Sequence, residues 1–283
     1  MKIAITGASG FLGSHLTEYF LSLGHTVKEI TRSTVDLTSG QEVEKWFLEN
    51  GPIDCVIHTA INGGRAEDTD NIKSFTENLQ MYYTLSSQKD HFKVMINFCS
   101  GAAFDRREEI QRVEEKEIIR STPVDLYGLA KNMIARDILH LNSNIINLRL
   151  FGVFGENEHP NRLFKSLIRG IQEDTEFILD VNKKMDFVYV GDVCRAVEYC
   201  VTHHTEFIPR DLNIVYDKKI TLGSMFHILE DILESSNDLI MFNKSSSEEY
   251  TGDPGLSRAT FPAGTYLGIK HGLRNMCFPD TSK

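Results

Sequence analysis

The stretch from Gly7 to Gly13, GASGFLG, decides the fold of this chain. It follows a β-rich run over residues 2–6 and opens a run over 11–23 with apolar residues at helical spacing. The three glycines permit a sharp turn, close approach of backbone N–H groups to a pyrophosphate, and tight packing of helix on strand. The helix dipole then favours an anion at the N-terminus. We therefore predict a dinucleotide-binding turn, with cofactor contacts from Gly7, Ser9, Gly10, Phe11, Leu12 and Gly13.

Strand-like and helix-like segments alternate through the first two thirds of the chain. Apolar strands joined by amphipathic helices predict an α/β fold, a doubly wound parallel sheet with helices on both faces. The expected strands cover residues 25–31, 54–60, 94–100 and 144–151, and the expected helices cover 41–50, 75–88 and 126–141.

The alternation of strands and helices changes after about residue 154, where a smaller lobe is expected. We predict a dinucleotide-binding domain over residues 1–155, to which 186–202 could return, and a substrate-binding lobe over 156–283. The lobe is expected to hold helices over 160–169 and 222–233 and short strands over 186–190 and 212–216.

Two polar segments are predicted to lie outside the regular core. The tail from Ser245 is rich in Ser, Gly and Pro, which indicates irregular structure. The stretch from Arg106 to Arg120 mixes charges of both signs at helical spacing, which is typical of a solvated helix.

The composition excludes several classes of protein. The 283 residues are 41% hydrophobic, enough for a sizeable core, and 30 Lys+Arg against 40 Asp+Glu give a formal net charge of −10. This acidic balance disfavours nucleic acid and anionic membranes as partners. No apolar run approaches the roughly 18 residues that span a bilayer, and the five cysteines show no metal-binding spacing. We expect a cytoplasmic protein with reduced thiols, no metal site and no signal peptide.

The residues after the second strand bear on the choice of cofactor. A carboxylate that grips the ribose 2′-hydroxyl is expected about 20 residues after the glycines, but the strand ends in Thr31 and is followed by Arg32. A guanidinium in this place suits a 2′-phosphate, so NADP(H) is favoured over NAD(H). Asp36 and Leu37 are expected beside the adenine.

A further group of candidates ends the strand over 54–60. The carboxyl ends of parallel strands are where such sheets bind ligands, so the cofactor is expected to contact His58, Thr59 and Ala60. His58 is interpreted as a histidine of the cofactor side or the core rather than as an acid–base group.

A tyrosine and a lysine lie one helical turn apart in the sequence YGLAK. Tyr127 and Lys131 would share one helix face, where the ammonium would lower the pKa of the phenol toward working pH. Such a phenol is a suitable general acid for a carbonyl. Ser100 ends the strand VMINFCS, so its hydroxyl could bind the same carbonyl oxygen.

Taken in order, GASGFLG, FCSGAAFD, YGLAK, LRLFGVFG and MDFVYVGD resemble the extended short-chain dehydrogenase/reductase superfamily, in its branch of nucleotide-sugar epimerases, dehydratases and 4-ketoreductases. The resemblance implies a Rossmann domain with a small substrate lobe. It implies that Tyr127 donates or accepts the proton, that Lys131 holds the nicotinamide ribose, and that Ser100 binds the reacting oxygen. Backbone groups from Phe151 to Val153 would lie near the nicotinamide, and such enzymes are often homodimers.

Departures from the family pattern narrow the reaction. Gly101 and Ala102 stand where the 4,6-dehydratases carry an Asp-Glu pair, and neither can act as an acid or base. They are expected to line the substrate. The bifunctional epimerase-reductases carry a cysteine after the serine, whereas Cys99 precedes Ser100 here and would point to the other side of the strand. Ketone reduction and epimerisation through a transient ketone remain, and the NADP signature favours reduction.

The predicted substrate lobe also differs from the family pattern. Met185 replaces an arginine that grips the substrate diphosphate in related epimerases. Lys183, Lys184, Arg162 or Arg169 could substitute, although a substrate without a nucleotide gains credibility. Asn161 and Arg162 begin the substrate loop and are expected either to touch substrate or to be surface residues.

The preferred hypothesis is an NADPH-dependent reductase of a 4-keto-6-deoxy sugar carried on a nucleoside diphosphate. One alternative is an NAD-dependent nucleotide-sugar 4-epimerase. Another, of a different class, is a non-catalytic dinucleotide-binding regulatory protein, against which an intact Ser100, Tyr127 and Lys131 argue.

Overall fold

Strand β1, Lys2–Thr6, lies inside a six-stranded sheet that is parallel throughout. The computed structural model describes residues 1–63, 71–140, 144–235 and 240–279. The sheet order is β10-β6-β4-β3-β1-β2. The other strands are β2 (Thr26–Ile30), β3 (Ile53–His58), β4 (Phe92–Ser100), β6 (Ile145–Leu150) and β10 (Asp211–Asn213). The predicted parallel α/β architecture is confirmed.

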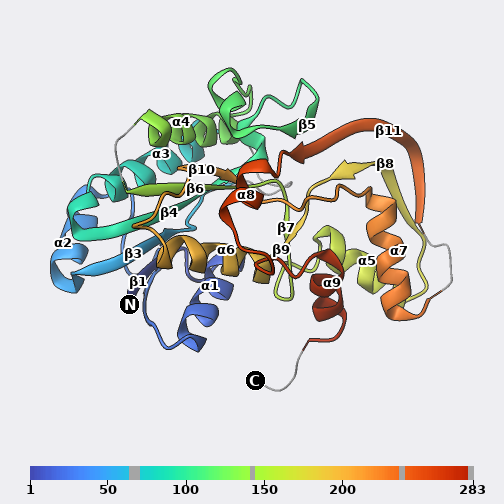
Figure 1. Ribbon diagram of the computed structural model, residues 1–283, viewed down its shortest axis with the longest axis horizontal. Coiled ribbons are helices and arrows are strands. Elements are labelled where there is room, and N and C mark those ends of the chain that lie inside the picture. The colour runs from blue at the N-terminus through green and yellow to red at the C-terminus, as the bar shows by residue number, and fades with distance from the viewer. Residues whose placement is uncertain (64–70, 141–143, 236–239, 280–283) are drawn as a thin grey trace.

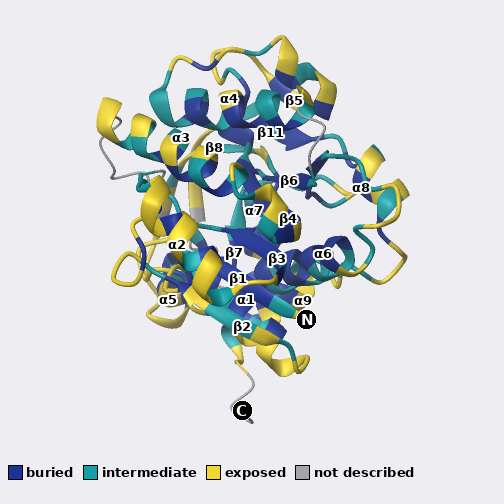
Figure 2. Ribbon diagram, turned by 90° about the vertical axis from the view of Figure 1, so that its left-hand side faces the viewer, coloured by how far each residue is buried: buried dark blue, intermediate teal, exposed yellow. Residues whose placement is uncertain are grey.

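Helices cover both faces of this sheet (Figure 1). Successive strand residues point to opposite faces, so Ile3 and Ile5 pack with α1 and α6, whereas Ala4 packs with the helices of the other face. Figure 2 shows the central strands buried and much of the outer surface of the helices exposed. The helices are α1 (Phe11–Ser22) and α6 (Val190–Thr202) on one face and α2 (Gly40–Asn50), α3 (Ile72–Ser86) and α4 (Leu126–His140) on the other.

The strand order reverses around β1, which pairs with β2 on one side and β3 on the other. The chain therefore leaves the carboxyl ends of β1 and β3 in opposite directions, and such a switch point is where doubly wound sheets bind ligands. The glycine-rich turn follows β1, and His58 ends β3. The fold thus brings two of the predicted cofactor segments together.

The C-terminal part of the chain adds a smaller layer beside the sheet (Figure 1). Its three-stranded parallel sheet has the order β5-β11-β8. Short strands β7 (Val153–Phe154) and β9 (Val188–Tyr189) pair with each other. The remaining elements are β5 (Ile110–Val113), α5 (Leu163–Gln172), β8 (Phe177–Met185), α7 (Leu222–Leu233), β11 (Ile240–Gly252), α8 (Gly255–Thr260), α9 (Ile269–Cys277), and the 3₁₀ turns η1 (Lys89–His91), η2 (Gly101–Ala103) and η3 (Glu115–Ile119).

Two predictions about polar segments are wrong. The tail from Ser245 is not irregular: it contains most of β11 and both α8 and α9. The stretch from Arg106 to Arg120 is not one solvated helix but holds β5 and η3, with Ile110 and Ile118 buried. In both cases the segment is ordered by partners far along the chain, because β11 pairs with β5 and β8.

A buried carboxylate fastens the C-terminal segment to the main sheet. Asp192 on α6 accepts hydrogen bonds from the backbone N–H groups of Leu267 (2.8 Å) and Gly268 (2.9 Å) and from the Tyr216 hydroxyl (2.5 Å). Since α6 packs on the six-stranded sheet, these bonds hold the start of α9 against it. Among the residues described, no helix has the length and apolar character needed to cross a bilayer.

Candidate active site

The glycine-rich turn is shaped by close backbone contacts. Gly7 has a φ of +67°, and a Cβ on it would lie 2.8 Å from the Cα of Ala60. A Cβ on Gly13 would lie 2.2 Å from the carbonyl oxygen of Gly7, so only glycine lets α1 begin this close to β1. Ser9 and Gly10 are exposed, and no side chain caps the N-terminus of α1. This end of the helix therefore fits the pyrophosphate of a dinucleotide.

The end of β3 closes one side of this turn. Thr59 Oγ1 donates a hydrogen bond to the carbonyl of Thr6 at 2.7 Å, which ties the two strand ends together. His58 Nδ1 lies 2.8 Å from Thr6 Oγ1. Burial, aided by the charge of Lys131, lowers the pKa of His58 to about 3. The imidazole of His58 is therefore neutral at working pH.

Arg32 and Asp36 lie on the exposed side of the predicted adenine site. The Arg32 guanidinium is exposed and donates a hydrogen bond to Asn62 Oδ1. Asp36 is exposed, and hydrogen bonds from the side chain and backbone of Thr38 lower its pKa. Leu37 is buried in the core between the sheet and α2.

Ser100 and Tyr127 meet at the carboxyl end of β4. The Ser100 hydroxyl accepts the N–H of Ala102 at 3.1 Å, and it lies close enough to the Tyr127 phenol to lower the pKa of that phenol. Burial raises the pKa of Tyr127 to about 12, while the nearby Ser100 hydroxyl and the charge of Arg106 act in the opposite direction. The phenol is therefore neutral at working pH, the form that donates a proton.

Lys131 lies one turn along α4 from Tyr127. Its ammonium donates a hydrogen bond to the carbonyl oxygen of Phe98 at 2.6 Å, and burial lowers its pKa. The sequence led us to expect Lys131 to lower the pKa of Tyr127, whereas the cation that does so here is Arg106. The position under the end of β4 suits a lysine that holds a ribose.

Small residues make room beside Ser100. A Cβ on Gly101 would lie 2.5 Å from Phe151 Cδ1, and one on Gly128 would lie 2.3 Å from the carbonyl oxygen of Ala102. Phe151 is buried, and Val153 is half-buried at the start of β7. Cys99 is buried with its Sγ 3.7 Å from the carbonyl oxygen of Lys131. Gly101 and Ala102 thus bring no acid or base to the site.

The predicted substrate residues Asn161 and Arg162 and the candidate anion-binding residue Lys184 have different surroundings. Asn161 is exposed. Arg162 turns toward the cofactor side: it donates to the carbonyl of Val153 at 2.8 Å, and its Cζ lies 5.8 Å from the centroid of Phe11. Lys184 is held by Glu249, with 2.7 Å between Nζ and Oε1, so its charge is already balanced.

Two residues that the sequence analysis missed complete the site. Tyr250, on β11, lies beside Gly101, where a Cβ would be 2.6 Å from the Tyr250 hydroxyl oxygen, and its ring centroid is 5.3 Å from that of Phe151. Arg106 pairs with Asp125 at 2.9 Å and acts on both phenols, Tyr127 and Tyr250. No local sequence signal identifies Tyr250, because the strand carrying it is stabilised by remote pairing.

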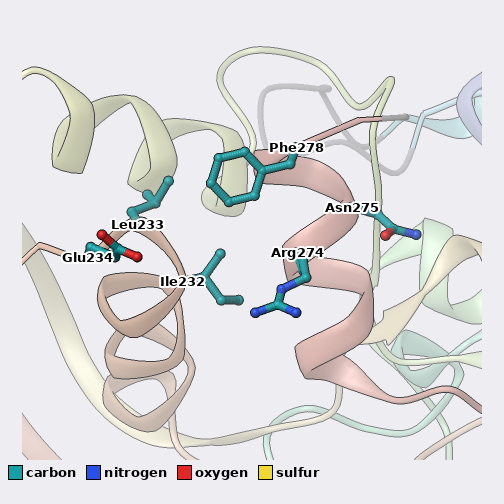
Figure 3. Close-up of a pocket in the computed structure, with 6 residues that line it drawn as sticks. All are labelled: Ile232, Leu233, Glu234, Arg274, Asn275 and Phe278. Carbon is teal, nitrogen blue, oxygen red and sulfur yellow. The ribbon is translucent and has the colours of Figure 1, made fainter. Parts of the chain in front are cut away.

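A separate groove of about 580 Å³ lies between α7 and α9 (Figure 3). Its lining residues are Ile232, Leu233, Glu234, Arg274, Asn275 and Phe278. None of these belongs to the site above, and the mixed charge indicates no particular ligand. Within the described ranges, no group of His, Cys, Asp and Glu residues is arranged to hold a metal ion.

The arrangement can deliver one proton to an oxygen placed beside Ser100. Tyr127 would donate it, the Ser100 hydroxyl would hydrogen bond to the same oxygen, and Lys131 would hold the cofactor ribose. A nicotinamide dinucleotide, which the turn at Gly7–Gly13 fits, supplies or accepts hydride when bound. Together these residues can support interconversion of a ketone and an alcohol.

A family model and a curated relative match most of this chain. The model of the NAD dependent epimerase/dehydratase family matches residues 3–214, a range that excludes Tyr250. CDP-abequose synthase of Salmonella muenchen is 22% identical over 248 residues, covering 84% of this chain and 83% of its own.

Solved structures show the same fold. The GDP-mannoheptose C4 reductase of Campylobacter jejuni, solved with NADP bound, superposes with a TM-score of 0.82 at 17% identity, covering 98% of this chain and 97% of its own. The UDP-glucose 4-epimerase of Thermus thermophilus, in complex with NAD, has a TM-score of 0.76 at 19% identity and covers 98% of each chain.

Proposed function

The chain belongs to the NAD dependent epimerase/dehydratase family, and from this membership we propose that it is an NADPH-dependent reductase of a nucleotide-linked 4-keto-6-deoxy sugar. It is an NAD(P)-dependent enzyme of the extended short-chain dehydrogenase/reductase superfamily. The observation that carries the proposal is the pairing of Ser100 and Tyr127 at the end of β4 with Gly101 and Ala102 beside them. Reduction needs one proton donor and no second acid or base.

The NADPH preference rests on Arg32. Its exposed guanidinium follows β2, where a carboxylate would repel a 2′-phosphate and bind a free ribose instead. The Campylobacter reductase, whose overall fold is the same, was solved with NADP. We therefore propose that the enzyme prefers NADP(H) to NAD(H) as its cofactor.

A nucleoside diphosphate sugar is the substrate class that the relatives support. Both the C4 reductase and the abequose synthase are named for nucleotide-linked sugars. With Met185 in place of an arginine and Lys184 paired to Glu249, the remaining candidates to hold the diphosphate are Lys183, Arg169 and Arg162, of which Arg162 also pairs with Glu158 at 3.4 Å.

The cysteines and the exposed apolar residues bear on where the enzyme is located and how it assembles. The five cysteines are all free thiols, four of them buried, which suits the reducing cytoplasm. We also propose a homodimer through α3 and α4, because Ile72, Tyr83 and Met133 are exposed on these helices. Light scattering coupled to size exclusion measures the assembly directly.

The test of the reaction is loss of NADPH absorbance with a panel of UDP-, GDP-, dTDP- and CDP-linked 4-keto-6-deoxy sugars. We expect oxidation of NADPH with at least one of them and formation of the corresponding alcohol. The Thermus epimerase has the same fold, so epimerisation is the competing outcome. Tightly bound NAD that copurifies with the protein, together with sugar isomerisation and no use of added NADPH, would establish that reaction instead.

A further inference from the structure

Two small residues next to Ser100 are covered by side chains from other parts of the chain. Gly101 is buried and Ala102 is only 4% exposed, whereas the side chains around them, Ser100, Tyr127 and Tyr250, are half-buried. A substrate beside Ser100 would therefore meet the side chains that cover Gly101.

Two aromatic residues form this cover. A Cβ on Gly101 would lie 2.5 Å from Phe151 Cδ1 and 2.6 Å from the Tyr250 hydroxyl oxygen. Consecutive Cα atoms are about 3.8 Å apart, so the phenolic hydroxyl lies within one residue of Ser100. Of the two covering side chains, Tyr250 is the one with a polar group.

The Tyr250 ring has a defined position against Phe151. The two rings meet edge to face, with centroids 5.3 Å apart and planes at 68°. A Cβ on Gly252 would lie 2.6 Å from Phe151 Cε2. A glycine at this position therefore makes room for the pair of rings.

The backbone that carries the ring is also fixed. Strand β11 returns from the small lobe to pair with β5 (Figure 1). The N–H of Asp186 donates to the carbonyl of Tyr250 at 3.1 Å, and its carboxylate accepts the N–H of Gly252 at 2.8 Å. Asp186 pairs in turn with Lys219 at 2.7 Å, with both side chains 4% exposed. Buried contacts thus hold the phenolic hydroxyl in place before any substrate binds.

The chemistry of the proposed substrate indicates what this hydroxyl could bind. In a 4-keto-6-deoxy hexose, one neighbour of the ketone carbon is C3, which carries a hydroxyl. The other is C5, which carries the ring oxygen and a methyl group. With the ketone oxygen held at Ser100 and Tyr127, the C3 hydroxyl is the nearest other hydrogen-bonding hydroxyl of the sugar. A phenol can donate to such a group or accept from it.

We propose that Tyr250 is a specificity-determining residue whose hydroxyl, placed over Gly101, hydrogen bonds to the C3 hydroxyl of the 4-keto sugar. The enzyme would thereby select a ketone that carries this hydroxyl over its 3-deoxy analogue. The inference rests on the proposed function for the identity of the substrate. Tyr127 remains the proton donor, and Tyr250 takes no part in proton transfer.

The kinetic test compares two nucleotide-linked 4-keto-6-deoxy sugars that differ only in the C3 hydroxyl. We expect the wild type to prefer the 3-hydroxy ketone. Tyr250→Phe, which keeps the ring against Phe151, should lower kcat/KM for this ketone about threefold to tenfold, the size of one neutral hydrogen bond. It should not lower kcat/KM for the 3-deoxy ketone. Equal losses for both ketones, or no loss for either, would overturn the proposal.

The matched control is Tyr266→Phe. The Tyr266 ring packs against Phe261 and Tyr216, in a different hydrophobic cluster from that of Tyr250 and Phe151. We expect this variant to keep the wild-type ratio of kcat/KM for the two ketones. Thermal melting and NADPH titration of both variants check that the fold and the cofactor site are intact.

A second measurement does not need turnover. Calorimetric titration of NADP-loaded protein with the two product alcohols should show tighter binding of the 3-hydroxy alcohol by the wild type. Tyr250→Phe should bind the two alcohols with equal affinity. Wild-type protein that shows this preference but oxidises NADPH with none of the ketones would contradict the proposed reduction and still support the role of Tyr250. Equal affinity of the wild type for the two alcohols, or binding of neither, would overturn the inference.

Discussion

Arg149 Nη2 and Asp211 Oδ2 lie 2.5 Å apart, and both side chains are buried where β6 pairs with β10. The guanidinium also donates to Asn213 and lies 4.8 Å from the centre of the Phe104 ring. Removing one partner of such a pair leaves an uncompensated charge in the core.

We therefore expect Asp211→Asn to lower the free energy of unfolding by about 3–5 kcal/mol, measured by urea denaturation. The control is Asp217→Asn, which removes an exposed partner of Arg258. Exposed pairs contribute about 0–1 kcal/mol. Equal losses of unfolding free energy in the two variants would show that the buried pair contributes no more stability than the exposed pair.

The glycine turn gives a prediction about cofactor binding. Gly13→Ala would place a Cβ 2.2 Å from the Gly7 carbonyl oxygen, so α1 must move away from β1. We expect loss of detectable NADPH binding in fluorescence titrations. Gly40→Ala, at the start of α2, meets open space and should bind the cofactor like the wild type.

Arg32 tests the choice between the two dinucleotides. Arg32→Ala removes the charge proposed to meet the 2′-phosphate, so NADPH affinity should fall about 10-fold to 100-fold, the range of a charged hydrogen bond. NADH, which lacks that phosphate, should bind almost as before. A similar loss for both cofactors would move Arg32 out of the binding site.

The pH dependence follows from the neutral phenol. Because the pKa of Tyr127 is raised to about 12, the proton-donating form persists through the neutral range and is lost only as pH rises toward that value. The rate of proton donation in ketone reduction should therefore change little with pH around neutrality. The rate of alcohol oxidation, which needs the phenolate, should increase with pH. Stopped-flow rates in both directions measure the two profiles.

Arg106 sharpens that prediction. Its charge lowers the pKa of Tyr127, so Arg106→Gln should raise this pKa and reduce alcohol oxidation at a fixed alkaline pH. Arg107→Gln is a matched control, because Arg107 pairs with Asp105 instead. If both variants oxidised alcohol at the wild-type rate, the charge of Arg106 would have no part in the reaction.

Lys183 and Lys184 are, with Arg162 and Arg169, the residues expected to substitute for the arginine that Met185 replaces. Since Lys184 is paired with Glu249, we expect Lys183→Glu alone to raise KM for a nucleotide-linked ketone, and Lys184→Glu to act mainly by repelling Glu249 and lowering Tm. A rise in KM for Lys184→Glu at unchanged Tm would return this lysine to the diphosphate site.

The sequence predicted those parts of the site whose pattern is local. The glycines of GASGFLG and the Tyr-Lys spacing of YGLAK each lie within one strand–helix unit, so short-range geometry is enough to interpret them. Ser100 was predicted because it ends a largely apolar strand. The same reasoning placed the predicted parallel sheet and most of its helices.

Tyr250 could not be found in this way. Strand β11 buries polar residues, and Thr251 accepts the N–H of Arg112 at 2.8 Å and donates to Glu249 at 2.9 Å. Because these partners satisfy its polar groups, the strand can be buried although its sequence is typical of an exposed tail. Only the folded topology shows that a Ser- and Glu-rich segment lies against Gly101, next to Ser100.

The parallel pairing of β11 has a consequence for the order in which the protein matures. During synthesis, residues 1–235 leave the ribosome before the strand that carries Tyr250. A nascent chain can thus form the cofactor domain while the pocket at Ser100 remains open on one side. The closure of this side must wait for a strand that pairs across almost half of the chain, a slow step in folding.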